Sequence, residues 1–354
     1  MTKYNFSPGP AKLNREVLEV VEKNILEYKA EGISILELSH RSNSFQEILD
    51  KTKDNLQQLL DIPSNYRILF LQGGATFQNA FIPHNIDDNK SLSNLVTGTW
   101  GAKTYEDFVK IRKIQKIDLD VPQIKDFLEQ GTDKYSDMTD YMHITSNETI
   151  EGVQIRNFNL INQNLIIDSS SDIGSYKFDW NNVAYLYAGA QKNLGIPGVT
   201  ISIIREDLIN ENQNPIYLNL KKLVDKDSIL NTPPTFSIYV LKLVTDWMLE
   251  TGGVDYFEQQ SIQNSKTVYS FLENYEDHVV LPIPEYSRSR MNIVFKFKNE
   301  MNEDSFIKKS LERNIIGIKG HRSVGGIRIS LYNSIDKSSV EYLLEFMKSF
   351  FEEL

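Results

Sequence analysis

The chain has 354 residues, of which 40% are hydrophobic and 24% are charged, so it can bury a large core and has an ordinary globular composition. Its net charge of −10 argues against nucleic acid or an anionic membrane as the main partner, and any anionic ligand must be bound by a few local basic groups. The chain contains no cysteine, which excludes disulfides, thiolate nucleophiles and zinc–thiolate sites.

The amino-terminal stretch Met1 to Pro10 lacks the apolar core of a signal peptide. No run elsewhere approaches the roughly 18 consecutive apolar residues that a membrane-spanning helix needs. We therefore expect a soluble, cytoplasmic protein.

Short apolar runs alternate with helical patterns through the first two-thirds of the chain. The patterns predict strands at 67–71, 95–97, 141–145, 165–168, 183–187 and 199–204, and helices at 101–111 and 121–129. Alternation of this kind predicts an α/β fold with a mostly parallel sheet that is covered by helices.

A glycine-rich turn, Gln72 to Gln78, follows the first of these strands and opens a helix. Free backbone N–H groups at a helix start bind phosphate, and Thr76 would add a hydroxyl group. Taken alone, the turn is equally consistent with a plain strand-to-helix connection. It is not a nucleotide-binding P-loop, because no Gly-Lys-Ser/Thr follows.

Trp100 follows the predicted strand 95–97 and lies between small residues in Thr97-Gly-Thr-Trp-Gly-Ala102. The small neighbours would leave room for a flat ligand to stack on the indole. Most tryptophans, however, pack in cores or at interfaces.

The predicted strand 165–168 ends on Asp168, and Lys192 lies in a glycine-rich turn after the next strand, 183–187. Taken singly, the aspartate has the usual role of a turn residue or helix cap. The lysine alone is equally typical of a side chain whose ammonium group reaches water. Adjacent strands would bring both to the sheet edge where such folds bind ligands. A pyridoxal phosphate site needs this pair, together with a phosphate cup and a cover for the ring, so the four features predict that cofactor.

The carboxyl third follows a different pattern, with predicted strands at 291–297 and 326–331 and a helix at 304–313 between them. A final helix carries an apolar face made of Val340, Leu343, Leu344, Met347, Phe350, Phe351 and Leu354. We therefore expect two domains: a large domain over 12–255, and a small α+β domain over 256–354 on which residues 1–11 pack.

Eight motifs along the whole chain carry a resemblance to a known family. They are Asn5-Phe-Ser-Pro-Gly-Pro10, Ser39-His-Arg41, Pro63-Ser-Asn-Tyr66, Asn147-Glu-Thr149, Tyr187-Ala-Gly-Ala-Gln-Lys-Asn193, Asn231-Thr-Pro-Pro-Thr-Phe236, Ser289-Arg-Met-Asn292 and Lys319-Gly-His-Arg-Ser-Val-Gly-Gly326. The chain resembles the fold type I, aspartate-aminotransferase-like pyridoxal phosphate enzymes, and within them the family of phosphoserine aminotransferases.

The resemblance implies that Lys192 binds the cofactor covalently and that Asp168 is the partner of its ring nitrogen. It further implies that Trp100 stacks on the ring and Thr149 hydrogen-bonds the phenolic oxygen. The cofactor phosphate would be held by Ala75, Thr76 and Gln191, and by Asn231 and Thr232 of a neighbouring subunit, which implies a homodimer with shared sites. Some members have a basic residue where this chain has Thr76, so the phosphate cup here would rest more on backbone N–H groups and hydroxyls.

The implied reaction transfers an amino group from L-glutamate to 3-phosphohydroxypyruvate in serine biosynthesis. By resemblance Arg328 grips the α-carboxylate, and its place in the apolar run 327–331 would be unfavourable for a charge without a ligand. The substrate phosphate would be bound by His40, Arg41, His321 and Arg322. The remaining histidines, His84, His143 and His278, are interpreted as structural.

Several alternatives stay open at this point. Another transaminase of the same fold, such as a serine or alanine–glyoxylate aminotransferase, has no use for the His-Arg pairs. A lysine-dependent lyase without cofactor and a non-catalytic dimeric scaffold are the others, whereas a cysteine desulfurase is excluded because the chain lacks cysteine. Phosphohydroxythreonine, of the vitamin B6 route, is a second possible phosphorylated substrate.

Overall fold

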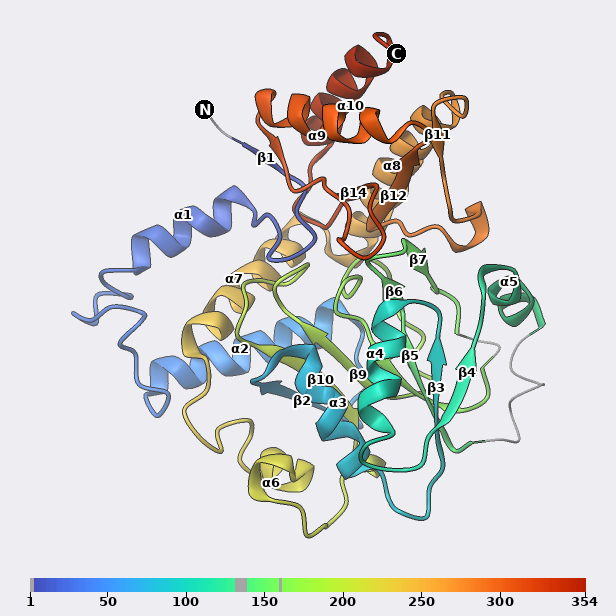
Figure 1. Cartoon of the computed structure of the whole chain (residues 1–354). Helices are drawn as coiled ribbons and strands as arrows, with labels where there is room; N and C mark the ends of the chain where they lie inside the picture. The colour runs from blue at the N-terminus through green and yellow to red at the C-terminus, as the bar shows by residue number, and fades with distance from the viewer. Residues whose placement is uncertain (1–2, 131–138, 159–160) are drawn as a thin grey trace.

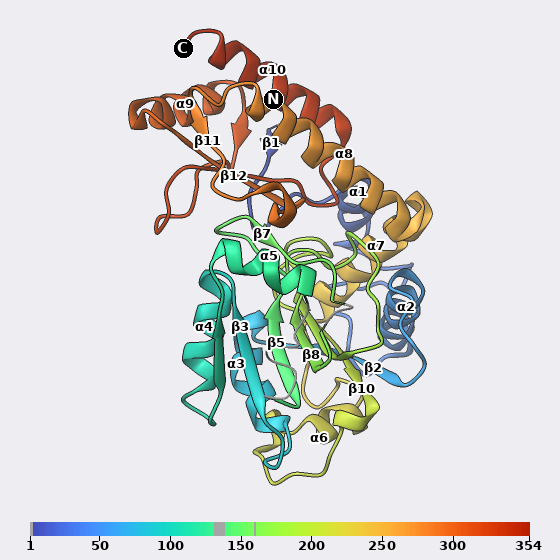
Figure 2. The ribbon, with the colours of Figure 1, turned by 90° about the vertical axis from the view of Figure 1, so that its right-hand side faces the viewer.

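The computed structural model describes residues 3–130, 139–158 and 161–354. A central sheet with helices on both sides forms the larger part, and the carboxyl-terminal helices and strands lie together at one end of it (Figures 1 and 2). The amino-terminal strand β1 (Tyr4–Asn5) lies at that same end, beside the carboxyl-terminal elements (Figure 1).

The central sheet has seven strands, and its order confirms the predicted α/β class. Their order is β2 (Tyr66–Leu71), β10 (Thr200–Arg205), β9 (Val183–Gly189), β8 (Asn164–Asp168), β5 (Tyr141–Thr145), β3 (Leu92–Val96) and β4 (Gln115–Asp118). Strand β10 runs antiparallel to both of its neighbours, while the other neighbouring pairs are parallel. The sequence analysis did not predict β4, because only Ile117 of its four residues is buried and the strand shows no apolar run.

Helices cover both faces of this sheet, as Figure 2 shows. On one side, α2 (Asn43–Leu59) and α7 (Thr235–Thr251) pack against each other and share a core with alternate sheet residues such as Ile201 and Ile203. On the other side lie α3 (Gly74–Asn85) and α4 (Thr99–Phe108), whose Phe81 and Phe108 pack with Tyr185 and Tyr187. Three further helices lie around these layers: α1 (Arg15–Asn24), α5 (Val121–Gln130) and α6 (Leu220–Asp225).

The carboxyl-terminal part is built on β12 (Asn292–Phe297), which pairs antiparallel with β11 (Val279–Val280) and β14 (Ile327–Ser330). Its helices are α8 (Gly253–Glu273), α9 (Glu300–Glu312) and α10 (Lys337–Phe351). Phe6 belongs to the hydrophobic core of this part, and β1 pairs in parallel with β13 (Ile315–Ile316). The predicted apolar face of the last helix is wrong at Leu354, because α10 ends at Phe351 and Leu354 is 44% exposed.

The division into domains at 255 and 256 stays a prediction, and α8 starts at Gly253, just ahead of it. Residues 1 and 2 of the predicted packing segment lie outside the described residues. A short hairpin of β6 (Asn147–Glu148) and β7 (Val153–Gln154) lies where the sheet meets the carboxyl-terminal part (Figures 1 and 2). In the part of the chain that the structure describes, no helix has both the length and the apolar character needed to span a membrane.

Candidate active site

A pocket of about 740 Å³ lies at the carboxyl ends of the parallel strands, beneath the carboxyl-terminal part. Its walls come from the amino-terminal loop, the first turns of α3 and α4, the β6–β7 hairpin, the ends of β5 and β8, and the loop after β9. The predicted site residues that line it are Ala75, Thr76, Trp100, Thr149, Asp168, Gln191, Lys192, His321 and Arg328.

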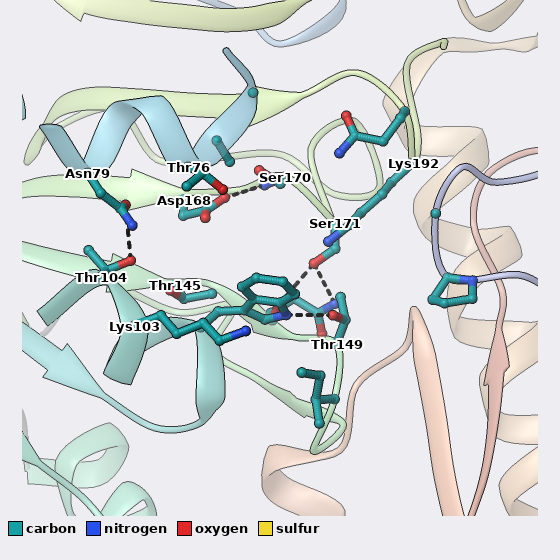
Figure 3. Close-up of a pocket in the computed structure, with 18 of the residues that line it drawn as sticks. Thr76, Asn79, Lys103, Thr104, Thr145, Thr149, Asp168, Ser170, Ser171 and Lys192 are labelled. Atoms are coloured by element: carbon teal, nitrogen blue, oxygen red, sulfur yellow. Dashed lines mark hydrogen bonds between the residues drawn. The ribbon is translucent and has the colours of Figure 1, made fainter. Parts of the chain in front are cut away.

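Lys192 and Asp168 share this pocket although 23 residues of chain separate them. Strands β8 and β9 are parallel neighbours, so Asp168 ends one strand while Lys192 follows the other. Figure 3 shows the Lys192 side chain extending into the pocket toward Ser171. Burial lowers the pKa of the Lys192 amine, although the negative charge of Asp168 opposes that shift. An amine with a lowered pKa is a better nucleophile at neutral pH.

Asp168 is held in place by hydrogen bonds from Ser170 and Tyr187. The backbone N–H of Ser170 donates to Oδ1 at 2.9 Å, and the hydroxyl of Tyr187 bonds the same carboxylate. Burial raises the pKa of Asp168, whereas these bonds favour its ionised form. The Tyr187 hydroxyl also lies 2.9 Å from Nε2 of His143. Burial lowers the pKa of His143 to about 3, so the imidazole is neutral at physiological pH.

The start of α3 offers backbone donors to the pocket. Gly73 precedes this helix with a φ of 89°, and a Cβ there would lie 2.6 Å from Phe77 Cβ, so the turn requires glycine. No side chain among the described residues caps the helix. The first N–H groups, from Gly74 to Thr76, are therefore free to bind an anion, and Thr76 lies beside Asp168 in the same pocket (Figure 3).

Trp100 forms one wall of the pocket and lies in the first turn of α4. Its indole Nε1 donates to Thr149 Oγ1 at 2.9 Å. The ring centroid is 5.9 Å from Nζ of Lys192 and 4.5 Å from Nζ of Lys103. The indole is therefore fixed within reach of the lysine that the sequence analysis singled out.

Arg328 supplies positive charge to the pocket, and His321 lines the pocket with it. Arg328 is only 7% exposed and donates from Nη1 to the backbone oxygen of Thr149 at 3.1 Å. Its Nε has no hydrogen-bond partner within the described ranges. A buried guanidinium with a free donor is suited to bind a carboxylate from a ligand. The pKa of His321 is lowered mainly by burial and also by the positive charges of Arg328 and Lys103.

The other predicted site residues do not line this pocket. They are His40, Arg41, Asn231, Thr232 and Arg322. Asn231 and Thr232 are exposed, and Gln72 Nε2 donates to the side-chain oxygen of Asn231 at 3.3 Å and to the backbone oxygen of Thr232 at 2.9 Å. Arg41 and Arg322 are exposed as well.

The structure also places residues in the pocket that the sequence analysis did not select. Lys103 comes from α4, one helical turn after Trp100, and that spacing was a signal that could have identified it. Gly9 comes from the amino-terminal loop, where a Cβ would lie 3.4 Å from Cγ of Lys192. Nothing in the local pattern of that loop indicates this contact, because it depends on how the amino terminus packs.

Comparisons with known proteins agree with this geometry. The family model of class-V aminotransferases matches residues 3–343. A phosphoserine aminotransferase of Lactococcus lactis is 40% identical over 99% of each chain. The solved structure of the phosphoserine aminotransferase of Bacillus circulans subsp. alkalophilus superimposes with a TM-score of 0.94 at 36% identity and covers 99% of each chain. A pyridoxal-phosphate-bound phosphoserine aminotransferase of Trichomonas vaginalis gives a TM-score of 0.89 at 31% identity, covering 98% of this chain and all of that one.

Proposed function

Because this chain belongs to the class-V aminotransferase family, we propose that it transfers the amino group of L-glutamate to 3-phosphohydroxypyruvate. The products are O-phospho-L-serine and 2-oxoglutarate, and the reaction is a step of serine biosynthesis. The chain is a pyridoxal-phosphate-dependent aminotransferase. A cytoplasmic location is part of the same proposal.

The pocket residues fit this cofactor. Lys192 offers an amine of lowered pKa, and Asp168 offers a carboxylate for the ring nitrogen. The start of α3 offers backbone N–H donors for the phosphate. Gln191 and Thr149 would add contacts to the phosphate and the phenolic oxygen. When bound, the cofactor supplies an aldehyde that reacts with amines and a ring that accepts electrons.

Within this reaction Lys192 has two tasks. It holds the cofactor before substrate arrives, and its released amine then moves the proton at Cα of the amino acid. The Ser170 and Tyr187 hydrogen bonds favour the ionised form of Asp168, which would hold a proton on the ring nitrogen. Trp100 lines the pocket and would cover the ring and restrict water from one side.

The observation that carries the assignment of a carboxylate-bearing substrate pair is the free donor of the buried Arg328. Its guanidinium is suited to the carboxylate next to the reacting carbon, which both the amino-acid and the 2-oxo-acid substrate possess, because a planar fork binds a carboxylate through two bonds. His321 lies beside it in the pocket and would donate a hydrogen bond to the substrate phosphate. His40, Arg41 and Arg322 complete that phosphate site in the proposal.

A homodimer is part of the proposal, with Asn231, Thr232 and some of these basic residues reaching the partner's pocket. Two observations support it. Asn231 and Thr232 are exposed on their own chain although Gln72 fixes their loop. Large apolar side chains are exposed along the amino-terminal segment, namely Leu18, Val20, Leu26, Ile33 and Leu36.

Purified protein loaded with pyridoxal phosphate tests the activity directly. We expect glutamate-dependent amination of 3-phosphohydroxypyruvate at a much higher kcat/KM than that of pyruvate or glyoxylate, which lack the phosphate. Phosphohydroxythreonine, assayed in the reverse direction, shows whether the site accepts a longer substrate. Equal kcat/KM values for glyoxylate and 3-phosphohydroxypyruvate would contradict the proposal and favour a glyoxylate aminotransferase. Arg41→Ala and Arg322→Ala should impair 3-phosphohydroxypyruvate more than glutamate.

Mixing two inactive variants tests the shared site. Lys192→Ala removes the amine of its own pocket, whereas Arg41→Ala removes a residue proposed to reach the partner's pocket. After the mixed chains are unfolded and refolded together, heterodimers contain one pocket with both residues intact. Activity above that of either variant alone is expected, and a monomeric mass in sedimentation would contradict the dimer.

A further inference from the structure

The first turn of α4 is held by two carboxyl groups from the β6–β7 hairpin. The residue before the helix is Gly98, which has no side chain to cap it. Instead Glu148 accepts from the backbone N–H of Trp100 through Oε2 at 2.9 Å and from that of Gly101 through Oε1 at 2.7 Å. Glu151 Oε1 accepts from the N–H of Thr99 at 3.1 Å. Three of the four N–H groups that a helix start leaves unpaired are thus satisfied by two glutamates.

This arrangement depends on close packing. A Cβ on Gly98 would lie 2.7 Å from both Cγ and Cδ of Glu148 and 2.7 Å from Oε2 of Glu151. The φ of Gly98 is −176°, so the glycine is needed for space and not for its backbone conformation. A Cβ on Gly101 would lie 3.1 Å from Oε1 of Glu148. The glycines on both sides of Trp100 therefore admit the Glu148 carboxyl group.

Two neighbouring residues of the hairpin hold the two ends of Trp100. Glu148 binds its backbone N–H, and Thr149 binds its indole Nε1 at 2.9 Å. The position of the ring relative to Lys192 thus depends on how the hairpin and α4 are joined. Glu148 is fully buried, and both of its carboxyl oxygens accept hydrogen bonds from α4. A buried acid in an interior of this kind must be fully hydrogen-bonded to be tolerated.

We propose that Glu148 is a positioning residue for transamination, whose carboxyl group fixes the first turn of α4 and thereby holds the Trp100 indole over the cofactor ring. The inference rests on the proposed function for the role of Trp100, while the contacts themselves belong to the protein without cofactor. Glu148 touches neither substrate nor cofactor in this account. Its effect passes through Trp100.

Glu148→Gln is the sharpest variant, because it keeps the shape of the side chain but leaves only one oxygen to accept a hydrogen bond. One backbone N–H of α4 then faces an NH₂ group and becomes unpaired. Gly98→Ala provides a second route, since its Cβ displaces the Glu148 carboxyl group without removing it. Asp336→Ala is the matched control: Asp336 Oδ1 caps α10 through the N–H of Ser339 at 2.7 Å, outside the pocket.

The measurement uses the near-ultraviolet circular dichroism of Trp100 in cofactor-free protein. Trp180 and Trp247 also contribute, so each spectrum is compared with that of the same protein carrying Trp100→Phe. We expect the Trp100 difference band to shrink in Glu148→Gln and Gly98→Ala, but not in Asp336→Ala. We also expect the dissociation constant of pyridoxal phosphate, measured by fluorescence quenching, to rise between about 5-fold and 100-fold, the range for one unpaired buried donor.

The outcomes separate this inference from the proposed function. A native Trp100 band and an unchanged cofactor affinity in both variants would overturn the positioning role, whatever the enzyme's substrate proves to be. A reduced band in a protein that fails to aminate 3-phosphohydroxypyruvate would retain the positioning role and contradict the substrate assignment. If Glu148→Gln does not fold, Gly98→Ala decides the question by the same two measurements.

Discussion

The carboxyl-terminal core and the pocket region bury different kinds of side chain. The core is made of aromatic rings, with Phe306 within 5.4 Å of Phe297 and 5.0 Å of Phe350 between ring centroids. The pocket region instead buries ionisable groups such as Glu148 and Arg328. Apolar burial tolerates rearrangement, because dispersion and the hydrophobic effect have no direction. Polar burial requires a partner at each donor and acceptor, so a small displacement has a large effect.

The largest expected effect is at Lys192. Lys192→Ala should lower kcat by at least about 10⁴-fold, because the covalent anchor and the proton-transfer group are lost together. The measurement is single-turnover and steady-state amination by cofactor-saturated protein. Lys177→Ala is the control, since Lys177 pairs with Asp255 on the surface, and it should retain native kcat. A Lys192→Ala protein within 10-fold of native turnover would refute the assignment.

The apolar core should respond in stability and not in chemistry. Phe306→Ala removes a fully buried ring and should lower the free energy of unfolding by about 3–5 kcal/mol. This free energy is measured by urea unfolding of the cofactor-free protein, with circular dichroism as the signal. The folded fraction of the variant should keep the native kcat. Leu311→Ala on the same helix is the control, because Leu311 is 56% exposed and should change stability by less than about 0.5 kcal/mol. Equal losses of unfolding free energy in Phe306→Ala and Leu311→Ala would contradict the difference expected between a buried and an exposed position.

Arg328 tests whether geometry matters beyond charge. Arg328→Lys keeps a cation but loses the planar fork, so the KM for glutamate should rise roughly 10- to 100-fold, as expected for a lost charge-assisted bond. Steady-state kinetics with varied glutamate measure this, with kcat less affected than KM. Arg313→Lys, at an exposed position of the carboxyl-terminal part, should leave both parameters native. An unchanged KM for glutamate in Arg328→Lys would contradict the assignment of the substrate α-carboxylate to this residue.

The last expected effect, which vanishes near neutral pH and grows in acid, is a pH dependence of stability at His143. Burial holds its pKa at about 3, below the ordinary value of 6.5, so the unfolded chain binds a proton that the folded chain does not. Stability is therefore fully present above about pH 6.5 and falls by about 1.4 kcal/mol per pH unit between there and pH 3. His143→Gln keeps a hydrogen-bonding group for Tyr187 but does not titrate. Urea unfolding at several pH values should show a shallower acid loss in the variant, and parallel pH profiles would contradict the neutral, buried imidazole.

The sequence predicted the sheet well because buried parallel strands are continuous apolar runs, as in 165–168 and 183–187. It missed β4, where three of four residues are polar, and it placed Leu354 on a helix that ends earlier. The predicted mostly parallel sheet is confirmed, but apolar runs do not reveal that β10 is the strand that runs antiparallel to its neighbours.

For the pocket, the sequence indicated residues that follow strands and turns, such as Asp168 and Lys192. It did not indicate Glu148 as a support for α4, because the two segments lie about 50 residues apart and meet only in the fold. Nor could it show which basic residues line the chain's own pocket. His321 and Arg328 do, while Arg41 does not, and this difference depends on packing at long range.

Chemical trapping of the cofactor tests the central claim most directly. Protein loaded with pyridoxal phosphate is reduced with borohydride, which makes any bond between the cofactor and an amine permanent, and the digested peptides are mapped by mass spectrometry. We predict a single modified residue, Lys192, and no stable label in Lys192→Ala. Label spread over exposed lysines, and equal in both proteins, would contradict a pyridoxal phosphate site in this pocket.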